Sequence, residues 1–236
     1  MEASADILRV ELEPVEIETS RTALVADRLT RGIFDGVLRP GQRLVERDIA
    51  QQLGVSKTPV REALKYLASR GLVTTRAYHG SEVRNVDSRA VVEIFNVRLL
   101  LEPAATKEAV SNVGPGIRDD LRDALQIGEE AEERENLVEL ILANRAFHAH
   151  LYSACGNDLL LSLLENLRDQ VGLITVSGWR VRPTWHQQAA EHAQILAAAE
   201  EGDAALAEQR VRSHIERAFR DLKAIFDEDE TSAGCS

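Results

Sequence analysis

The sequence has few cysteines and few aromatic residues. Two cysteines, Cys155 and Cys235, stand among 236 residues, and aromatic side chains make up 4 %. Two cysteines do not make the disulfide framework on which small secreted domains depend. No apolar stretch approaches the roughly 18 residues of a membrane-spanning helix. The first 20 residues carry six acidic side chains and one arginine, without the basic start and apolar centre of a secretory signal peptide. We therefore predict a reduced, cytoplasmic protein that does not span a membrane.

Strand-like alternation is also missing from most of the chain. From residue 88 onward, apolar residues recur at helical spacing, and Leu, Ala and Glu dominate. Glycine, proline and polar breaks separate helices predicted over residues 88–110, 116–133, 136–155, 157–181, 184–201 and 203–227. Pro103 could split the first of these, because proline removes a helical hydrogen bond. We predict a mainly α-helical protein in which residues 86–228 form an all-α bundle of six or seven helices, with a flexible tail over residues 229–236.

Positive charge is scarce overall but concentrated in one segment. The net charge is −11, which does not suit a protein that contacts DNA along its whole length. Residues 21–85 nevertheless hold 12 basic and 6 acidic side chains, whereas residues 86–236 hold 15 and 27. Residues 1–20 are acidic and are predicted to be a flexible tail. The uneven distribution indicates that one domain, residues 21–85, contacts phosphate.

Residues 46–83 contain the pattern that organises the chain. Two short amphipathic segments meet at Gly54, where the first helix is expected to end with a positive φ angle. The apolar residues of these segments are Ile49, Ala50 and Leu53, then Val60, Ala63, Leu64 and Leu67. Two short β segments follow near residues 72–75 and 81–84, and a further helix is predicted over residues 21–37. Two helices joined by a glycine turn and followed by a β hairpin predict a winged helix-turn-helix.

The residues of this motif resemble the GntR family of bacterial transcription factors. The resemblance rests on Pro59-Val60-Arg61-Glu62-Ala63-Leu64, on Gly71-Leu72-Val73 and on a His-Gly pair in the wing. Such proteins present the N-terminal end of the second helix to base edges and phosphates. Arg61 is expected to be the chief base reader, because arginine can bridge guanine O6 and N7. The resemblance implies further DNA contacts from Arg47, Ser56, Lys57 and Thr58, and from His79 and Gly80 in the minor groove.

Three histidines of the bundle stand among apolar residues. Asn144 and His148 lie four residues apart and therefore project from one helix face, while His192 and His214 belong to two later helices. A single inward histidine is more often a hydrogen-bonded core residue than a ligand. Together, the three imidazoles fit coordination of a divalent transition-metal ion.

A second resemblance concerns these same residues. Asn144-Arg145-Ala146-Phe147-His148, then Glu191-His192-Ala193-Gln194-Ile195, then His214, resemble the FCD domain of the FadR-like GntR regulators. The resemblance implies that His148, His192 and His214 bind a metal ion, with zinc expected first and nickel or manganese as alternatives. Asn144 stands where this family most often has Asp. Its neutral amide is expected to bind a dication more weakly than a carboxylate would.

The FCD resemblance also implies a cavity for a small organic acid beside the metal. Arg98 could pair with a carboxylate of that effector through its planar guanidinium. The equally weighted alternative is an internal ion pair with Glu102, four residues further along the same helix. Trp179 and Arg182 could line the cavity, although a structural role is favoured for both.

These patterns predict a ligand-responsive transcriptional regulator, most simply a repressor, and not an enzyme. A homodimer on a palindromic operator is expected, because one winged helix reads too few base pairs to be specific. The resemblance implies dimerisation through the bundle. Two alternatives are a pure metal sensor and a metal-dependent hydrolase or lyase fused to a DNA-binding domain. No general base at defined spacing and no Gly-x-Ser-x-Gly motif supports the enzyme.

Overall fold

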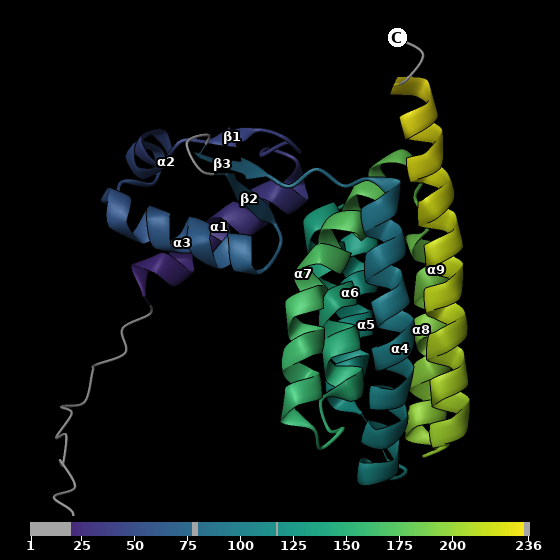
Figure 1. The fold of residues 1–236 in the computed structure, drawn as a ribbon. Coiled ribbons are helices and arrows are strands. Elements are labelled where there is room, and N and C mark those ends of the chain that lie inside the picture. Colours follow the sequence, from purple (N-terminus) through teal and green to yellow (C-terminus); the bar gives the residue numbers. More distant parts are fainter. Residues whose placement is uncertain (1–19, 77–79, 117, 234–236) are drawn as a thin grey trace, which may run out of the picture.

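The computed structural model describes residues 20–76, 80–116 and 118–233, and it is mainly helical with one small sheet (Figure 1). A short N-terminal unit stands beside an elongated bundle of helices. This confirms the predicted class, a winged helix-turn-helix followed by an all-α bundle. Among the described helices, none is both long enough and apolar enough to cross a membrane.

Three helices build the N-terminal unit: α1 (Arg21–Asp35), α2 (Glu46–Leu53) and α3 (Lys57–Ser69). Gly54 ends α2 with a φ angle of 66°, as its position predicted, and its N–H donates to the carbonyl of Ala50. A residue with a side chain would be strained at this φ angle, which glycine adopts freely. The buried faces of α2 and α3 are those expected from the sequence, consisting of Ile49, Ala50, Val60, Ala63, Leu64 and Leu67. Packing of these faces against α1 sets the direction of α3.

The sheet has three antiparallel strands in the order β1-β3-β2. They are β1 (Arg43–Leu44), β2 (Val73–Arg76) and β3 (Gly80–Val83), and Val73 lies opposite Val83. The hairpin of β2 and β3 was predicted, whereas β1 was not, because two residues show no alternation. Residues 77–79, which include the predicted contact His79, lie outside the described part of the chain.

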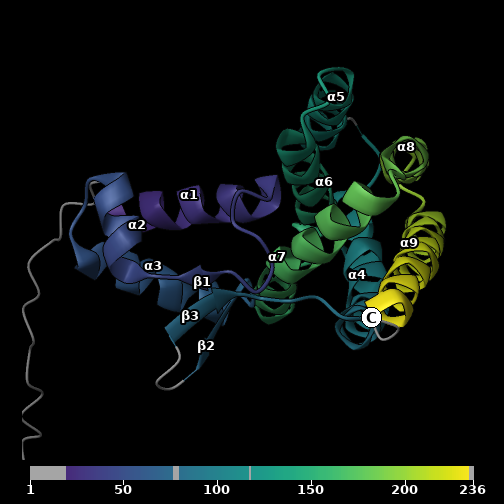
Figure 2. The ribbon, with the colours of Figure 1, turned by 90° about the horizontal axis from the view of Figure 1, so that it is seen from above.

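Six helices form the bundle over residues 88–233. They are α4 (Ser88–Val113), α5 (Asp119–Glu133), α6 (Leu137–Tyr152), α7 (Asp158–Val181), α8 (Trp185–Glu200) and α9 (Ala204–Ala233). Asp87, Asn136 and Asn157 cap three of them, because each side chain accepts a hydrogen bond from a backbone N–H of the first turn. Figures 1 and 2 show α4 and α9 side by side along the bundle.

Pro103 lies inside α4 but does not divide it. A proline at this position cannot donate to the carbonyl of Leu99, four residues earlier. Arg212 of α9 donates to that carbonyl instead, with an Nη1–O distance of 3.3 Å. Over the described residues the bundle has six helices, the lower of the two predicted numbers, and a neighbouring helix supplies a donor to the carbonyl that Pro103 leaves unpaired.

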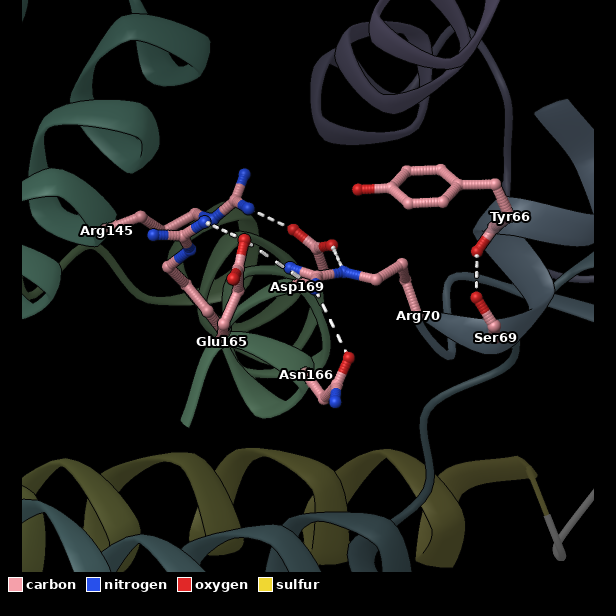
Figure 3. A network of polar contacts seen from close by, with 8 residues as sticks. Tyr66, Ser69, Arg70, Arg145, Glu165, Asn166 and Asp169 are labelled. Atoms are coloured by element: carbon pink, nitrogen blue, oxygen red, sulfur yellow. Dashed lines mark hydrogen bonds and ion pairs between the residues drawn. The ribbon is translucent and has the colours of Figure 1, made fainter. Parts of the chain in front are cut away.

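The N-terminal unit docks on α6 and α7, on the side of the bundle away from α9 (Figure 2). One apolar core runs through both parts, since buried residues of α1 and α3 pack with Ile141, Leu173, Val176 and Trp179. Beside this core, Asp169 of α7 lies between Arg70, at the end of α3, and Arg145 of α6 (Figure 3). Arg70 Nε donates to Asp169 Oδ2 over 2.6 Å, and both side chains are buried.

Gly71, directly after Arg70, permits the closest approach in this interface. Its φ angle is 70°, and a Cβ atom there would lie 2.5 Å from the side chain of Gln170. Gln170 also accepts a hydrogen bond of 2.6 Å from Arg84, which follows the last strand. The turn after α3 is thus held against α7 by shape as well as by charge.

Candidate DNA-binding surface and metal centre

The N-terminal end of α3 forms an exposed, basic surface. Ser56, Lys57, Thr58 and Arg61 are all exposed there, and Arg47 is exposed at the start of α2. Contact between Arg61 and Glu46 brings the start of α2 beside the first turns of α3. The structure thus gathers five of the predicted DNA contacts at one end of this helix pair. Gly80 lies apart from them, exposed at the start of β3 in the wing.

Arg61 has an internal partner in this structure. Its Nε and Nη2 donate to the two carboxylate oxygens of Glu46 over 3.1 and 3.0 Å. These hydrogen bonds lower the pKa of the Glu46 carboxyl, which therefore stays ionised. A guanidinium held by two oxygens in one plane presents the same fork that would bind guanine. Arg61 must exchange Glu46 for a base edge if it reads DNA.

The three predicted histidines meet in the middle of the bundle. His148 comes from α6, His192 from α8 and His214 from α9, with exposed fractions of 6, 4 and 2 %. One ring nitrogen of each lies within 4.8 Å of those of the other two. Asn144 lies beside them, because it lines one small hollow with His192 and another with His148. His148, His192, His214 and Asn144 thus form one buried polar cluster, although they come from three helices far apart in the sequence.

Three buried polar atoms at this point lack a hydrogen-bond partner among the described residues, namely Asn144 Oδ1, His148 Nδ1 and His192 Nε2. Such atoms are costly in a protein interior unless something else satisfies them. Burial, reinforced by neighbouring histidines and Arg98, lowers the pKa of His192 and His214 well below the ordinary value. The imidazoles of His192 and His214 are therefore neutral, as metal coordination requires. Three imidazole nitrogens and one amide oxygen fit zinc or a similar divalent ion.

Two carboxylates lie close to ring nitrogens of the histidines. Glu191 of α8 places Oε2 2.7 Å from Nδ1 of His214, and Arg217 donates to the same oxygen. Glu102 of α4 places Oε2 3.3 Å from Nδ1 of His148. The sequence did not predict these contacts, because each joins residues of two different helices. The only signal was the place of Glu191 immediately before His192 in the FCD-like motif.

Arg98 forms an ion pair with Glu102, which was the predicted alternative to an effector contact. Its Nε donates to Glu102 Oε1 over 2.5 Å and its Nη2 to Oε2 over 3.2 Å, and both side chains are buried. Although burial favours the neutral acid, Arg98 and His148 hold the pKa of the Glu102 carboxyl well below its usual range. Arg98 still lines one of the two small hollows, together with Asn144 and His148.

The hollows beside the histidines are small. That of Arg98 has a volume of about 20 Å³, and the other, lined by Trp179, Trp185 and His192, has about 30 Å³. Each has room for an ion or a water molecule but not for a metabolite. A larger hollow of about 200 Å³ shares Trp185 with the second one and lies toward the turn between α5 and α6.

The other two predicted effector residues differ in position. Trp179 is buried, lines the 30 Å³ hollow and donates from Nε1 to Thr184 Oγ1 over 3.1 Å. Arg182 lies at the end of α7, half exposed, with its Nη2 3.2 Å from Glu228 Oε2. It lines neither hollow beside the histidines. The structure therefore brings Trp179 to the histidines and leaves Arg182 outside their surroundings.

Comparison with known proteins assigns both parts of the chain. Residues 21–83 match the bacterial regulatory proteins of the gntR family, and residues 93–217 match the FCD domain. The HTH-type transcriptional regulator McbR of Escherichia coli K12 is 33 % identical over 153 residues, 65 % of this chain and 69 % of McbR. The "Probable D-xylose utilization operon transcriptional repressor" of Paenarthrobacter nicotinovorans is 31 % identical over 84 % of this chain and 86 % of its own length.

A solved structure agrees with these sequence matches. The crystal structure of a GntR transcriptional regulator from Rhodococcus sp. RHA1 superposes with a TM-score of 0.74 at 26 % identity, over 86 % of this chain and 98 % of that one. The relatives are transcriptional regulators and not enzymes, so the hydrolase or lyase alternative is set aside. The chain belongs to the GntR family of transcriptional regulators, with a winged helix-turn-helix and a C-terminal FCD domain.

Proposed function

We propose that this protein is a cytoplasmic repressor whose affinity for a palindromic operator depends on a metal ion and a small effector in the FCD bundle. Residues 21–85 bind DNA, and residues 86–228 bind the metal and effector and form the dimer. The observation that carries the proposal is the buried cluster of three histidines and Asn144 in a bundle docked on a winged helix. Repression is favoured because the D-xylose relative is named a repressor.

DNA binding is assigned to the exposed end of α3. Arg61 reads a guanine, and Arg47, Ser56, Lys57 and Thr58 hold phosphates or neighbouring bases. His79 and Gly80 of the wing reach the minor groove. The surplus of basic residues in 21–85 supports this assignment, since counterion release from phosphates supplies much of the affinity for DNA.

The metal is assigned to His148, His192, His214 and Asn144. These four side chains would hold a dication, which would supply a Lewis acid to which an effector oxygen could bind. None of the four side chains carries a negative charge in this state, so an anionic effector, such as a small carboxylic acid, is favoured beside the ion. Trp179 forms the apolar wall of the neighbouring hollow, while Arg98 acts on this site through Glu102.

A second candidate, a pure metal sensor, is supported by the size of the hollows. Volumes of about 20 and 30 Å³ accommodate an ion without any movement of the helices. An organic effector requires the 30 Å³ hollow to open toward the 200 Å³ hollow next to it, past Trp185.

One titration separates the two candidates. Operator affinity is measured on metal-free protein, on zinc-loaded protein, and on zinc-loaded protein with a series of small organic acids. A change with zinc alone identifies a metal sensor, whereas a change that requires an acid identifies a metabolite regulator. No change in either series would overturn the proposed function.

Dimerisation is tested separately. Residues 88–236, produced alone, should sediment as a dimer at micromolar concentration, since the FCD bundle is assigned the dimer contact. A monomer mass for both this fragment and the full chain would contradict the proposal.

A further inference from the structure

We propose that Glu191 and Glu102 are positioning residues of the metal centre. Each holds one histidine in the tautomer that carries its proton on Nδ1, and thereby turns the lone pair of Nε2 toward the ion. The inference rests on the metal centre proposed above. It adds Glu191 and Glu102 to that centre, and it specifies which ring nitrogen of each histidine binds the metal ion.

The contact between Glu191 and His214 identifies the tautomer. Glu191 Oε2 lies 2.7 Å from His214 Nδ1, within hydrogen-bond distance. An ionised carboxylate can only accept, so the hydrogen belongs to Nδ1. The neutral imidazole, which is the form that binds a metal ion, has a single N–H. Nε2 of His214 is therefore left as the atom that can bind a metal.

His148 repeats this arrangement on the other side of the histidines. Its Nδ1 lies 3.3 Å from Oε2 of Glu102, which belongs to another helix. This contact is looser than the one at His214, because Nδ1 of His148 makes no hydrogen bond, but the nearby carboxylate oxygen still favours the proton on Nδ1 and leaves the lone pair on Nε2. His192 differs, because its Nε2 is buried and has no hydrogen-bond partner among the described residues. Nε2 is therefore the atom that we assign to the metal ion in His148, His192 and His214.

Each carboxylate is itself held by an arginine. Arg98 donates two hydrogen bonds to Glu102, and Arg217 donates to Glu191. The two sets of arginine, glutamate and histidine come from different helices, and their histidines belong to the same buried cluster. The arginines keep the carboxylates ionised and fix their orientation. They also neutralise them, so the glutamates direct the histidines without adding net negative charge.

This division of roles has a measurable consequence. A carboxylate behind a ligating histidine raises the basicity of the imidazole and fixes its orientation, and its loss typically lowers metal affinity 10–100-fold. Asn144, by contrast, affects affinity through the charge of a direct ligand. Because the two effects are separate, the factor lost on Glu191→Gln should be about the same in the wild type and in Asn144→Asp.

The first test measures the zinc dissociation constant of full-length protein by competition with a chromophoric chelator. Glu191→Gln should bind zinc about 10–100-fold more weakly than the wild type. Glu201→Gln, which neutralises an exposed glutamate at the end of the same helix, should bind zinc as the wild type does. Thermal unfolding of the metal-free variants establishes that both are folded. Unchanged zinc affinity in a folded Glu191→Gln would overturn the inference.

The second test reads the tautomer directly in metal-free wild-type protein. Nitrogen-15 labelling of the six histidines gives a simple NMR spectrum in which protonated and unprotonated ring nitrogens differ in shift. His214, assigned by its loss in a His214→Gln variant, should carry its proton on Nδ1. A proton on Nε2 would overturn the inference whatever the zinc affinity. A wild type that binds no zinc would instead overturn the metal centre itself, and the wild-type titration reveals this independently.

Discussion

At the scale of single residues, Asn144 is the member of the proposed metal centre that distinguishes it most from a carboxylate-containing site. Its Oδ1 is buried without a partner among the described residues, next to three histidines. An amide oxygen can bind a metal ion, but it brings no charge to oppose that of the dication. Spacing related Asn144 to His148, and the apolar surroundings and the FCD resemblance grouped them with His192 and His214, which the structure places close together. The sequence could not predict the orphaned atoms, which depend on how three helices pack.

The first prediction concerns Asn144→Asp. The added carboxylate should raise zinc affinity by at least about tenfold, because a full negative charge in a partly desolvated site attracts the dication strongly. His192→Ala should lower metal content and remove the effect of metal on operator binding. For both variants, chelator competition measures the zinc affinity and metal analysis measures the metal content. Asn96→Asp, which adds the same charge at an exposed position of α4, is the control. Equal metal content in all of these proteins would contradict the assignment.

The second prediction concerns Arg61. Arg61→Ala should weaken operator binding by about 1–3 kcal/mol and relax the preference at one base pair, because a bidentate contact is lost. Fluorescence anisotropy with wild-type and single-substituted operators provides the measurement. Arg89→Ala, an exposed arginine of the bundle paired with Glu93, should leave both quantities unchanged. A uniform loss on all sequences would show that Arg61 contacts phosphate instead.

At the scale of helices, local signals in the sequence predicted most boundaries within a few residues. Apolar spacing located each helix, and Asp87, Asn136 and Asn157 start helices by capping them. Local signals could not show whether α4 stays continuous at Pro103. Nor could they show that Arg212 of α9 donates to the Leu99 carbonyl, which Pro103 leaves without its helical partner. Strand β1 was missed for a related reason, since it exists only by pairing with β3.

The third prediction tests the start of α4. The Asp87 carboxylate accepts a hydrogen bond of 2.7 Å from the N–H of Ala90. Asp87→Ala should lower the free energy of unfolding by about 1 kcal/mol, whereas Asp87→Asn, which keeps an acceptor oxygen, should change it little. Urea denaturation followed by circular dichroism measures both. Equal losses in the two variants would mean that the negative charge, and not the cap, is what stabilises this helix.

At the scale of the whole molecule, the two domains form one packed body in this structure. A shared apolar core and the Arg70–Asp169–Arg145 group join them. The sequence predicted two domains of opposite charge but not this contact, because it pairs residues about a hundred positions apart. The position of the bundle on the winged helix is therefore a property of tertiary packing alone.

The fourth prediction tests this junction. Asp169→Asn leaves Arg70 and Arg145 without their shared carboxylate in a buried place, and should lower the free energy of unfolding by about 3–5 kcal/mol. Glu165→Gln, which removes a half-exposed partner 3.9 Å from Arg70, should cost less than about 1 kcal/mol. Chemical denaturation of full-length protein compares them. If Asp169→Asn were as stable as Glu165→Gln, the ion pairs would not be what joins the domains.

The pair of Arg61 and Glu46 has a consequence for the search along DNA. Glu46 already offers Arg61 two coplanar oxygens, much as a guanine edge would. If Arg61 reads a guanine as proposed, a DNA sequence that presents poorer acceptors would gain little by displacing Glu46, and Arg61 would stay paired with Glu46. Only a base pair that binds the guanidinium better than the carboxylate does would draw the side chain toward the DNA. Glu46 would then set a threshold that separates scanning from recognition.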